Sequence, residues 1–88
     1  MFKLDFSKRA ERQLSKMNPQ VRKIILLWLK KNVNNCKNPR AHGKALKGDK
    51  AGLWRYRIGD YRVICEIKDS ELVVLALSLG HRREVYER

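Results

Sequence analysis

The sequence predicts an α+β fold in which two N-terminal helices pack on one face of a largely antiparallel, four-stranded sheet. Three observations predict it. Strand and helix patterns follow one another in the order β-α-α-β-β-β, and 88 residues suit a single domain, residues 1–88. Two alternating runs flank Gly59-Asp60, which is a two-residue hairpin turn signal. Residues 72–79 are almost wholly apolar, as in a central strand buried on both faces.

The first strand and both helices come from the N-terminal part of the chain. Residues 2–6 alternate between apolar and polar, and Ser7 can then cap a helix on the basic segment 8–16. Asn18-Pro19 predicts the start of a second helix, since Asn is a good N-cap and Pro suits the first helical position. That helix should end near residue 33 or 34. Its apolar stripe consists of Val21, Ile24, Ile25, Trp28 and Leu29.

Residues 35–50 are rich in Asn, Pro and Gly and predict a long loop, which is a frequent location of functional residues. Within it, Leu46 can anchor the segment while Lys44 and Lys47 stay exposed. The hairpin follows this loop, and residues 68–71 predict a second turn before the apolar strand.

The hairpin separates apolar and basic side chains onto opposite faces, because side chains alternate along a strand. A two-residue loop pairs Arg57 with Arg62 and Arg55 with Ile64. Arg55, Arg57 and Arg62 therefore share one face. The other face holds Trp54, Tyr56, Ile58, Tyr61, Val63 and Cys65. Two like charges in cross-strand contact cost up to ~1 kcal/mol, so this face either binds an anion or is an ordinary solvated surface.

The same register can be extended through the second turn. It then places Val73, Leu75 and Leu77 beside Arg62 and Ile64. The face opposite the helices becomes an apolar bed carrying three arginines, which resembles a binding cleft.

The charge of the chain points to a polyanionic partner. The net charge is +12, the sequence pI is 10.2, and residues 12–48 contain ten Lys or Arg but no Asp or Glu. Nucleic acid, an acidic membrane surface and an acidic protein all fit this charge, and the uneven distribution favours contact with phosphates. The candidate residues for this phosphate contact are Arg22, Lys23, Lys30, Lys31, Lys44 and Lys47.

The composition argues against a metal site, a disulfide scaffold and a membrane span. Cys36 and Cys65 form no CxxC or Cys/His cluster, and two thiols in a cytoplasmic protein are simpler than one disulfide. The N-terminus lacks the apolar core of a signal peptide, and the runs 24–29 and 72–77 are too short to cross a bilayer. The scattered carboxylates offer no Mg²⁺ cluster, so no cofactor is expected.

Chemistry on the arginine-bearing face needs a proton carrier from elsewhere. Arginines hold phosphate oxygens in a forked geometry but stay protonated at physiological pH. The C-terminal segment offers His81 and Tyr86, and histidine is the natural general acid or base among side chains. His81 follows Gly80 at a strand end, so its ring can reach the arginines. Alternatively, His81 is a surface histidine and Tyr86 fixes the tail.

Three motifs together resemble the RelE/ParE toxin superfamily, most of all the RelE branch of bacterial toxin–antitoxin modules. They are Lys44-x-Leu46-Lys47-Gly48, W-R-Y-R-I-G-D-Y-R-V over residues 54–63, and G-H-R-R-E-V-Y over residues 80–86. The resemblance implies a metal-independent toxin that enters the ribosomal A site, contacts 16S rRNA, and cuts mRNA by attack of the 2′-OH on the adjacent phosphate. It also implies a RelB-like antitoxin, and operator DNA bound only through the antitoxin complex.

The resemblance also implies roles for individual residues. Arg55 and Arg57 match two basic positions that are lysines in the best-known member, and arginine can keep their charge but hardly a proton-transfer role. Arg62 matches the arginine that binds the scissile phosphate. Arg82 matches a leaving-group or phosphate contact.

The C-terminal motif carries the implied proton chemistry. Tyr86 matches a tyrosine that orients and deprotonates the 2′-OH or stacks on a base, and His81 occupies a position where some relatives carry a catalytic histidine. The lysine-to-arginine departures make His81 the expected acid or base. Two other functions stay open: a ParE-like inhibitor of DNA gyrase without RNase activity, and a non-catalytic nucleic-acid-binding module.

Overall fold

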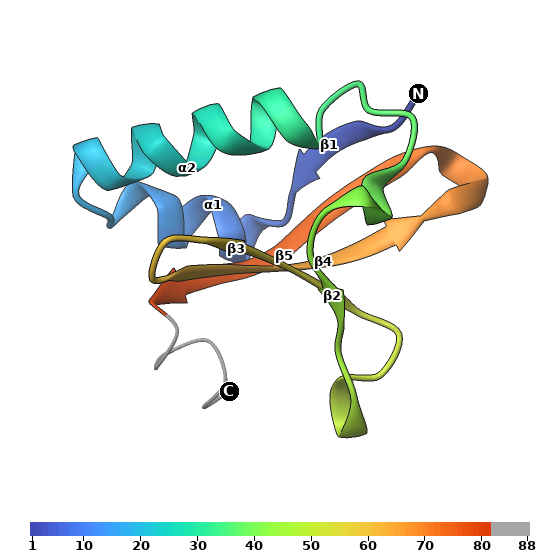
Figure 1. Cartoon of the computed structure of the whole chain (residues 1–88). Helices are drawn as coiled ribbons and strands as arrows, with labels where there is room; N and C mark the ends of the chain where they lie inside the picture. Colours follow the sequence, from blue (N-terminus) through green and yellow to red (C-terminus); the bar gives the residue numbers. More distant parts are fainter. Residues whose placement is uncertain (82–88) are drawn as a thin grey trace.

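A computed structural model of the chain describes residues 1–81 and contains one five-stranded sheet in the order β1-β5-β4-β3-β2. β1 pairs parallel with β5, and the other pairs are antiparallel. Both helices lie on one face of the sheet (Figure 1). The elements are β1 (Lys3–Phe6), α1 (Lys8–Ser15), α2 (Pro19–Asn32), β2 (Lys44–Ala45), β3 (Trp54–Ile58), β4 (Tyr61–Lys68) and β5 (Val73–His81). The α+β class is confirmed, with one strand more than the four expected.

The capping residues start both helices where the sequence predicts. The Ser7 side chain accepts a hydrogen bond from the Ala10 N–H at 3.1 Å, and the Asn18 side chain accepts one from the Gln20 N–H at 2.8 Å. α2 ends at Asn32 with Val33 as its C-cap, within two residues of the expected end. The helix layer is therefore fixed by local sequence signals.

The hairpin register is confirmed from Trp54↔Cys65 to Ile58↔Tyr61. Tyr56, Val63 and Cys65 are fully buried on the helix-covered side, in one cluster with residues of both helices. This burial leaves the arginines of β3 and β4 on the opposite face.

The register between β4 and β5 differs from the expected one. Arg62 lies opposite Gly80, while Leu75 and Val73 lie further along, opposite Glu66 and Lys68. The cause is a register shift between Ile64 and Cys65, whose partners Ser78 and Ala76 are not consecutive. Leu77 is thus the extra residue of a β-bulge. The expectation of an apolar bed beside Arg62 is therefore wrong. The residue opposite Arg62 on β5 is Gly80, which carries no side chain.

Residues 35–50 were expected to form a loop, but they are attached to the core at several points. The Tyr56 hydroxyl donates a hydrogen bond to the Pro39 carbonyl, and the Trp54 indole donates one to the His42 carbonyl at 2.7 Å. The His42 ring packs edge-on against Trp28 with ring centroids 5.6 Å apart. β2 then pairs with β3 and brings Lys44 opposite Arg55.

Both cysteines are free thiols, as expected, and we predict that they react unequally. Burial raises the pKa of the Cys65 thiol from 9.0 to about 12 and also raises the pKa of the half-buried Cys36. A thiol reagent at about pH 8 should label Cys36 slowly and Cys65 only after unfolding. The labelling rates of the two thiols are measured by absorbance in buffer and in denaturant. Equal labelling rates for Cys36 and Cys65 in the folded protein would contradict the prediction.

The raised pKa of Cys65 also links stability to alkaline pH. The folded state holds this proton more tightly than the unfolded state does. The stability that Cys65 contributes is therefore complete below pH 9.0 and is lost as the pH rises toward about 12.

Candidate nucleic-acid interface

Four basic residues lie in two adjacent rows on the sheet face opposite the helices. One row runs Lys44, Arg55, Ile64, Ser78, and the next pairs Arg57 with Arg62 and Gly80. We call this surface the arginine face, defined by Lys44, Arg55, Arg57 and Arg62. Three predicted arginines are thus brought together, and β2 adds a lysine that the sequence placed in a loop.

Arg62 is the buried member of the arginine face. Only 6% of its surface is exposed, and its Nε is buried without a hydrogen-bond partner among the described residues. Its Nη1 donates to the carbonyls of Gly59 and Tyr61 at 3.4 Å each, which is long for an N–H···O bond. A buried charge with such weak partners costs stability. An anionic ligand would supply the strong acceptors that this guanidinium lacks.

Arg57 is exposed and faces Arg62 directly, and Arg55 is half-buried in the adjacent row. Within residues 1–81, no carboxylate forms an ion pair with Arg57 or Arg62. The one such bridge in that part of the chain joins Arg40 to Asp69, at the other end of β4. The arginine face is thus suited to phosphate binding and to stabilising negative charge.

His81 does not lie on the arginine face. It pairs with Tyr61, so both side chains project from the face of the sheet that the helices cover. Their rings pack edge-on with centroids 5.7 Å apart. The expectation that the His81 ring reaches the arginines is therefore wrong. The bulge at Leu77 is the reason, since one extra residue sends every later side chain of β5 to the other face.

The remaining predicted residues are separated from this face or lie outside the described residues. Arg82 and Tyr86 belong to residues 82–88, which the structure does not describe. Lys47 is exposed after β2. The basic residues of α2 lie in the helix layer, on the other side of the sheet, and are Arg22, Lys23, Lys30 and Lys31.

Among the described residues, the arginine face carries Lys44 but no His or Tyr side chain that could transfer a proton. Tyr56 is buried on the helix side, and burial raises the pKa of its phenol, which donates to Pro39. Among residues 1–81, no three His, Cys, Asp or Glu side chains lie close enough together to hold a metal ion. No helix in that part of the chain is long and apolar enough to cross a membrane.

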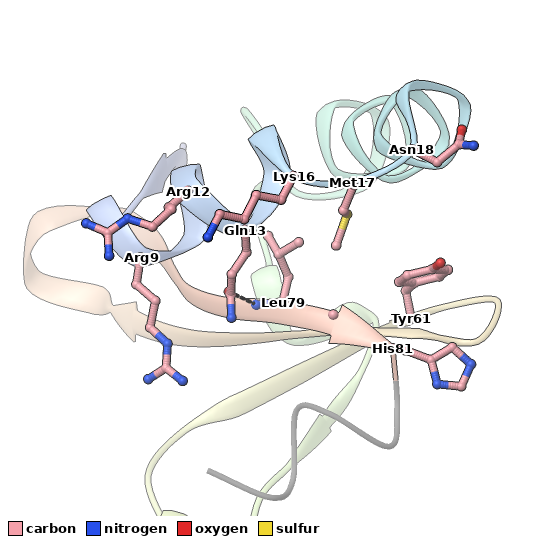
Figure 2. A pocket seen from close by; sticks show the side chains of 10 residues that line it. Arg9, Arg12, Gln13, Lys16, Met17, Asn18, Tyr61, Leu79 and His81 are labelled. Carbon is pink, nitrogen blue, oxygen red and sulfur yellow. Dashed lines mark hydrogen bonds between the residues drawn. The ribbon is translucent and has the colours of Figure 1, made fainter.

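A second basic site, which was not predicted from the sequence, is a groove of about 650 Å³ between α1 and the ends of β4 and β5. Figure 2 shows Arg9, Gln13 and Lys16 reaching from α1 toward β5, with Tyr61 and His81 at the other end. Arg9, Arg12 and Lys16 follow i, i+3, i+7 spacing, which places them on one side of a helix. That spacing is the signal that reveals the site in the sequence.

Comparison with known proteins relates this fold to bacterial toxins. Residues 4–86 match the family described as the ParE toxin of the type II toxin–antitoxin system, parDE. Toxin RelG of Mycobacterium tuberculosis is 29% identical over 83 residues, covering 94% of this chain and 93% of that protein.

Solved structures give the same relationship. A chain of the M. tuberculosis toxin–antitoxin complex RelBE2 superimposes with a TM-score of 0.83 at 26% identity, covering 94% of this chain and 93% of that one. The isolated Escherichia coli RelE toxin gives 0.71 at 24% identity, covering 99% and 93%, and shows the shared fold. The chain therefore belongs to the ParE toxin family within the RelE/ParE superfamily and is the toxin of a type II toxin–antitoxin system.

Proposed function

We propose that this toxin is a ribosome-dependent, metal-independent endoribonuclease that cleaves mRNA in the A site. The observation that carries the proposal is Arg62, a buried guanidinium without strong acceptors beside Arg55 and Arg57. A surface that retains such an arrangement at a cost in stability is suited to an anionic ligand. RNA supplies both the phosphate and, in its 2′-OH, the nucleophile.

In the proposed reaction the 2′-oxygen attacks the adjacent phosphorus. The new P–O bond closes a 2′,3′-cyclic phosphate, and the bond from phosphorus to the 5′-oxygen breaks. A base removes the 2′-OH proton, and an acid protonates the departing 5′-oxygen. The arginines hold the non-bridging oxygens and stabilise the charge that grows on them, but they transfer no proton.

The antitoxin is proposed from the relatives. One structural relative was solved as the toxin–antitoxin complex RelBE2. We infer a cognate RelB-like antitoxin for this chain, an acidic or neutralising partner for a net charge of +12. Operator DNA would be bound through that complex.

Primer extension on programmed ribosomes tests the proposal. Purified toxin should cut mRNA at positions fixed by the A-site codon, with EDTA present, and a Lys37→Gln variant should behave as wild type. Cuts that do not follow the codon frame, or no cuts at all, would exclude ribosome-dependent cleavage. A supercoiling assay run in parallel tests gyrase inhibition, which the ParE family match keeps as the second candidate.

The proton carrier is tested by comparing two tail variants. His81 lies on the helix side of the sheet, so we assign proton transfer to Tyr86, as the resemblance implies. Tyr86→Phe should slow single-turnover cleavage by about 100-fold or more. His81→Ala should slow it at least about tenfold less than Tyr86→Phe does. The reverse order of effects would return the role to His81.

A further inference from the structure

The groove between α1 and the sheet exists because β1 is short. Its pairing with β5 ends at Phe6↔Ala76, so no strand among the described residues covers the edge of residues 77–81 on that side. α1 passes over this edge instead, and Gln13 accepts a hydrogen bond from the Leu79 N–H at 2.8 Å. Figure 2 shows this bond as a dashed line between α1 and β5.

The lining of the groove is cationic. Arg9, Arg12 and Lys16 line it from α1, and none of the described lining residues is acidic. All three are exposed, and none forms an ion pair within the described part of the chain. Three cations in a lining that contains no acidic residue form a site for successive phosphates, because each phosphate contact releases condensed counterions.

The far end of the groove is aromatic. Tyr61 is half-buried, and the His81 ring packs edge-on against it and supports its orientation. Met17 completes the apolar side of this end. A planar ring next to a basic channel is the arrangement that proteins use to stack an unpaired base while the backbone follows the cations.

We propose that this groove binds a stretch of single-stranded RNA, with phosphates on Arg9, Arg12 and Lys16 and a base stacked on Tyr61. The choice of RNA among polyanions rests on the proposed function. The groove is separate from the arginine face, because the side chains of Tyr61 and Arg62 project from opposite faces of the sheet. RNA held here would extend the contact of the toxin beyond the cleaved codon.

Fluorescence anisotropy with a short 2′-O-methyl RNA measures this binding without ribosomes and without a nucleophile for cleavage. The triple variant Arg9→Gln, Arg12→Gln, Lys16→Gln should bind at least about tenfold more weakly at about 0.1 M salt. Its plot of log affinity against log salt should be shallower by about 2. A matched triple variant of exposed lysines outside the groove controls for total charge: Lys3→Gln, Lys8→Gln and Lys37→Gln.

The stacking part of the proposal is tested by two variants of Tyr61. Tyr61→Phe keeps the ring and should bind as wild type, while Tyr61→Leu keeps apolar bulk and should lose about fivefold. Circular dichroism and Tm establish that each variant is folded. Equal losses in the two triple variants, or wild-type binding by Tyr61→Leu, would overturn the proposal. A polyglutamate probe that loses the same affinity as RNA in every variant would also overturn it.

The outcome is separable from the proposed function. If the protein shows this binding pattern but does not cut mRNA on ribosomes, the proposed nuclease function is wrong and the proposed RNA-binding groove stands. If the protein cuts mRNA at positions fixed by the A-site codon but lacks this binding pattern, the nuclease function stands and the RNA-binding groove is wrong.

Discussion

Replacing Arg62 with methionine is expected to abolish mRNA cleavage while leaving the protein at least as stable as wild type. The guanidinium is buried, its Nε has no partner among the described residues, and its two Nη1 contacts are long. Loss of a preorganised charge at a phosphoryl centre should lower cleavage by about 100-fold or more. Methionine fills similar space without a charge, so the free energy of unfolding should rise by about 1 kcal/mol.

Single-turnover cleavage on ribosomes and urea unfolding measure the two effects on the same protein. Arg57→Met is the matched control for stability, because Arg57 is exposed on the opposite strand and its replacement should change the free energy of unfolding by less than about 0.5 kcal/mol. A large loss of stability in Arg62→Met would identify Arg62 as a structural residue. Full cleavage activity would remove it from the proposed site.

The arginine cluster could be predicted because one local signal fixes it. A two-residue turn at Gly59-Asp60 sets the pairing of β3 and β4, and the pairing sets which side chains share a face. No long-range information enters that argument. The burial of Arg62 was not predictable in the same way, since it depends on how neighbouring elements enclose the strand.

The position of His81 shows where alternation fails. Val74 and Ala76 are buried on the helix side, and strict alternation would continue with Ser78 and Gly80. The chain buries Leu79 instead, because a Leu fills the core where Ser or Gly would leave a void. The bulge at Leu77 inverts the alternation of side chains in the rest of β5, so the His81 side chain projects toward the helices. The polar Ser78 within an apolar run is the one sequence hint of this shift.

Strand β2 and the shape of the groove depend on contacts between distant segments, and only the spacing of the three groove cations on α1 is visible in the sequence. β2 has two residues, too few for periodicity, and it exists because Gly43 passes close to β3. The groove exists because β1 has only four residues and its pairing with β5 ends at Phe6↔Ala76. The last residues of β5 are therefore covered by α1 and not by a strand. Both features are consequences of packing between segments far apart in the chain, and both add cations to the surfaces that the proposed function uses.

Gly43→Ala is expected to destabilise this protein strongly, although it adds a single methyl group. Gly43 has a φ of +86°, and a Cβ there would lie 2.3 Å from the Arg55 carbonyl oxygen and 2.6 Å from the Trp54 indole nitrogen. The carbonyl is backbone of β3 and cannot move without breaking strand pairing. We expect a loss of roughly 2–4 kcal/mol in the free energy of unfolding, measured by urea denaturation.

Gly52→Ala is the matched control, because Gly52 also has a positive φ, of +95°, but a Cβ there meets nothing within 4 Å. It should lose only about 1 kcal/mol, the cost of the left-handed backbone for alanine. The difference between the two variants therefore measures the close approach of Gly43 to β3. If that approach positions Lys44 opposite Arg55, Gly43→Ala should also weaken RNA cleavage at temperatures where the chain remains folded, and Gly52→Ala should not. Equal stability losses would mean that backbone conformation alone, and not contact with β3, requires glycine at position 43.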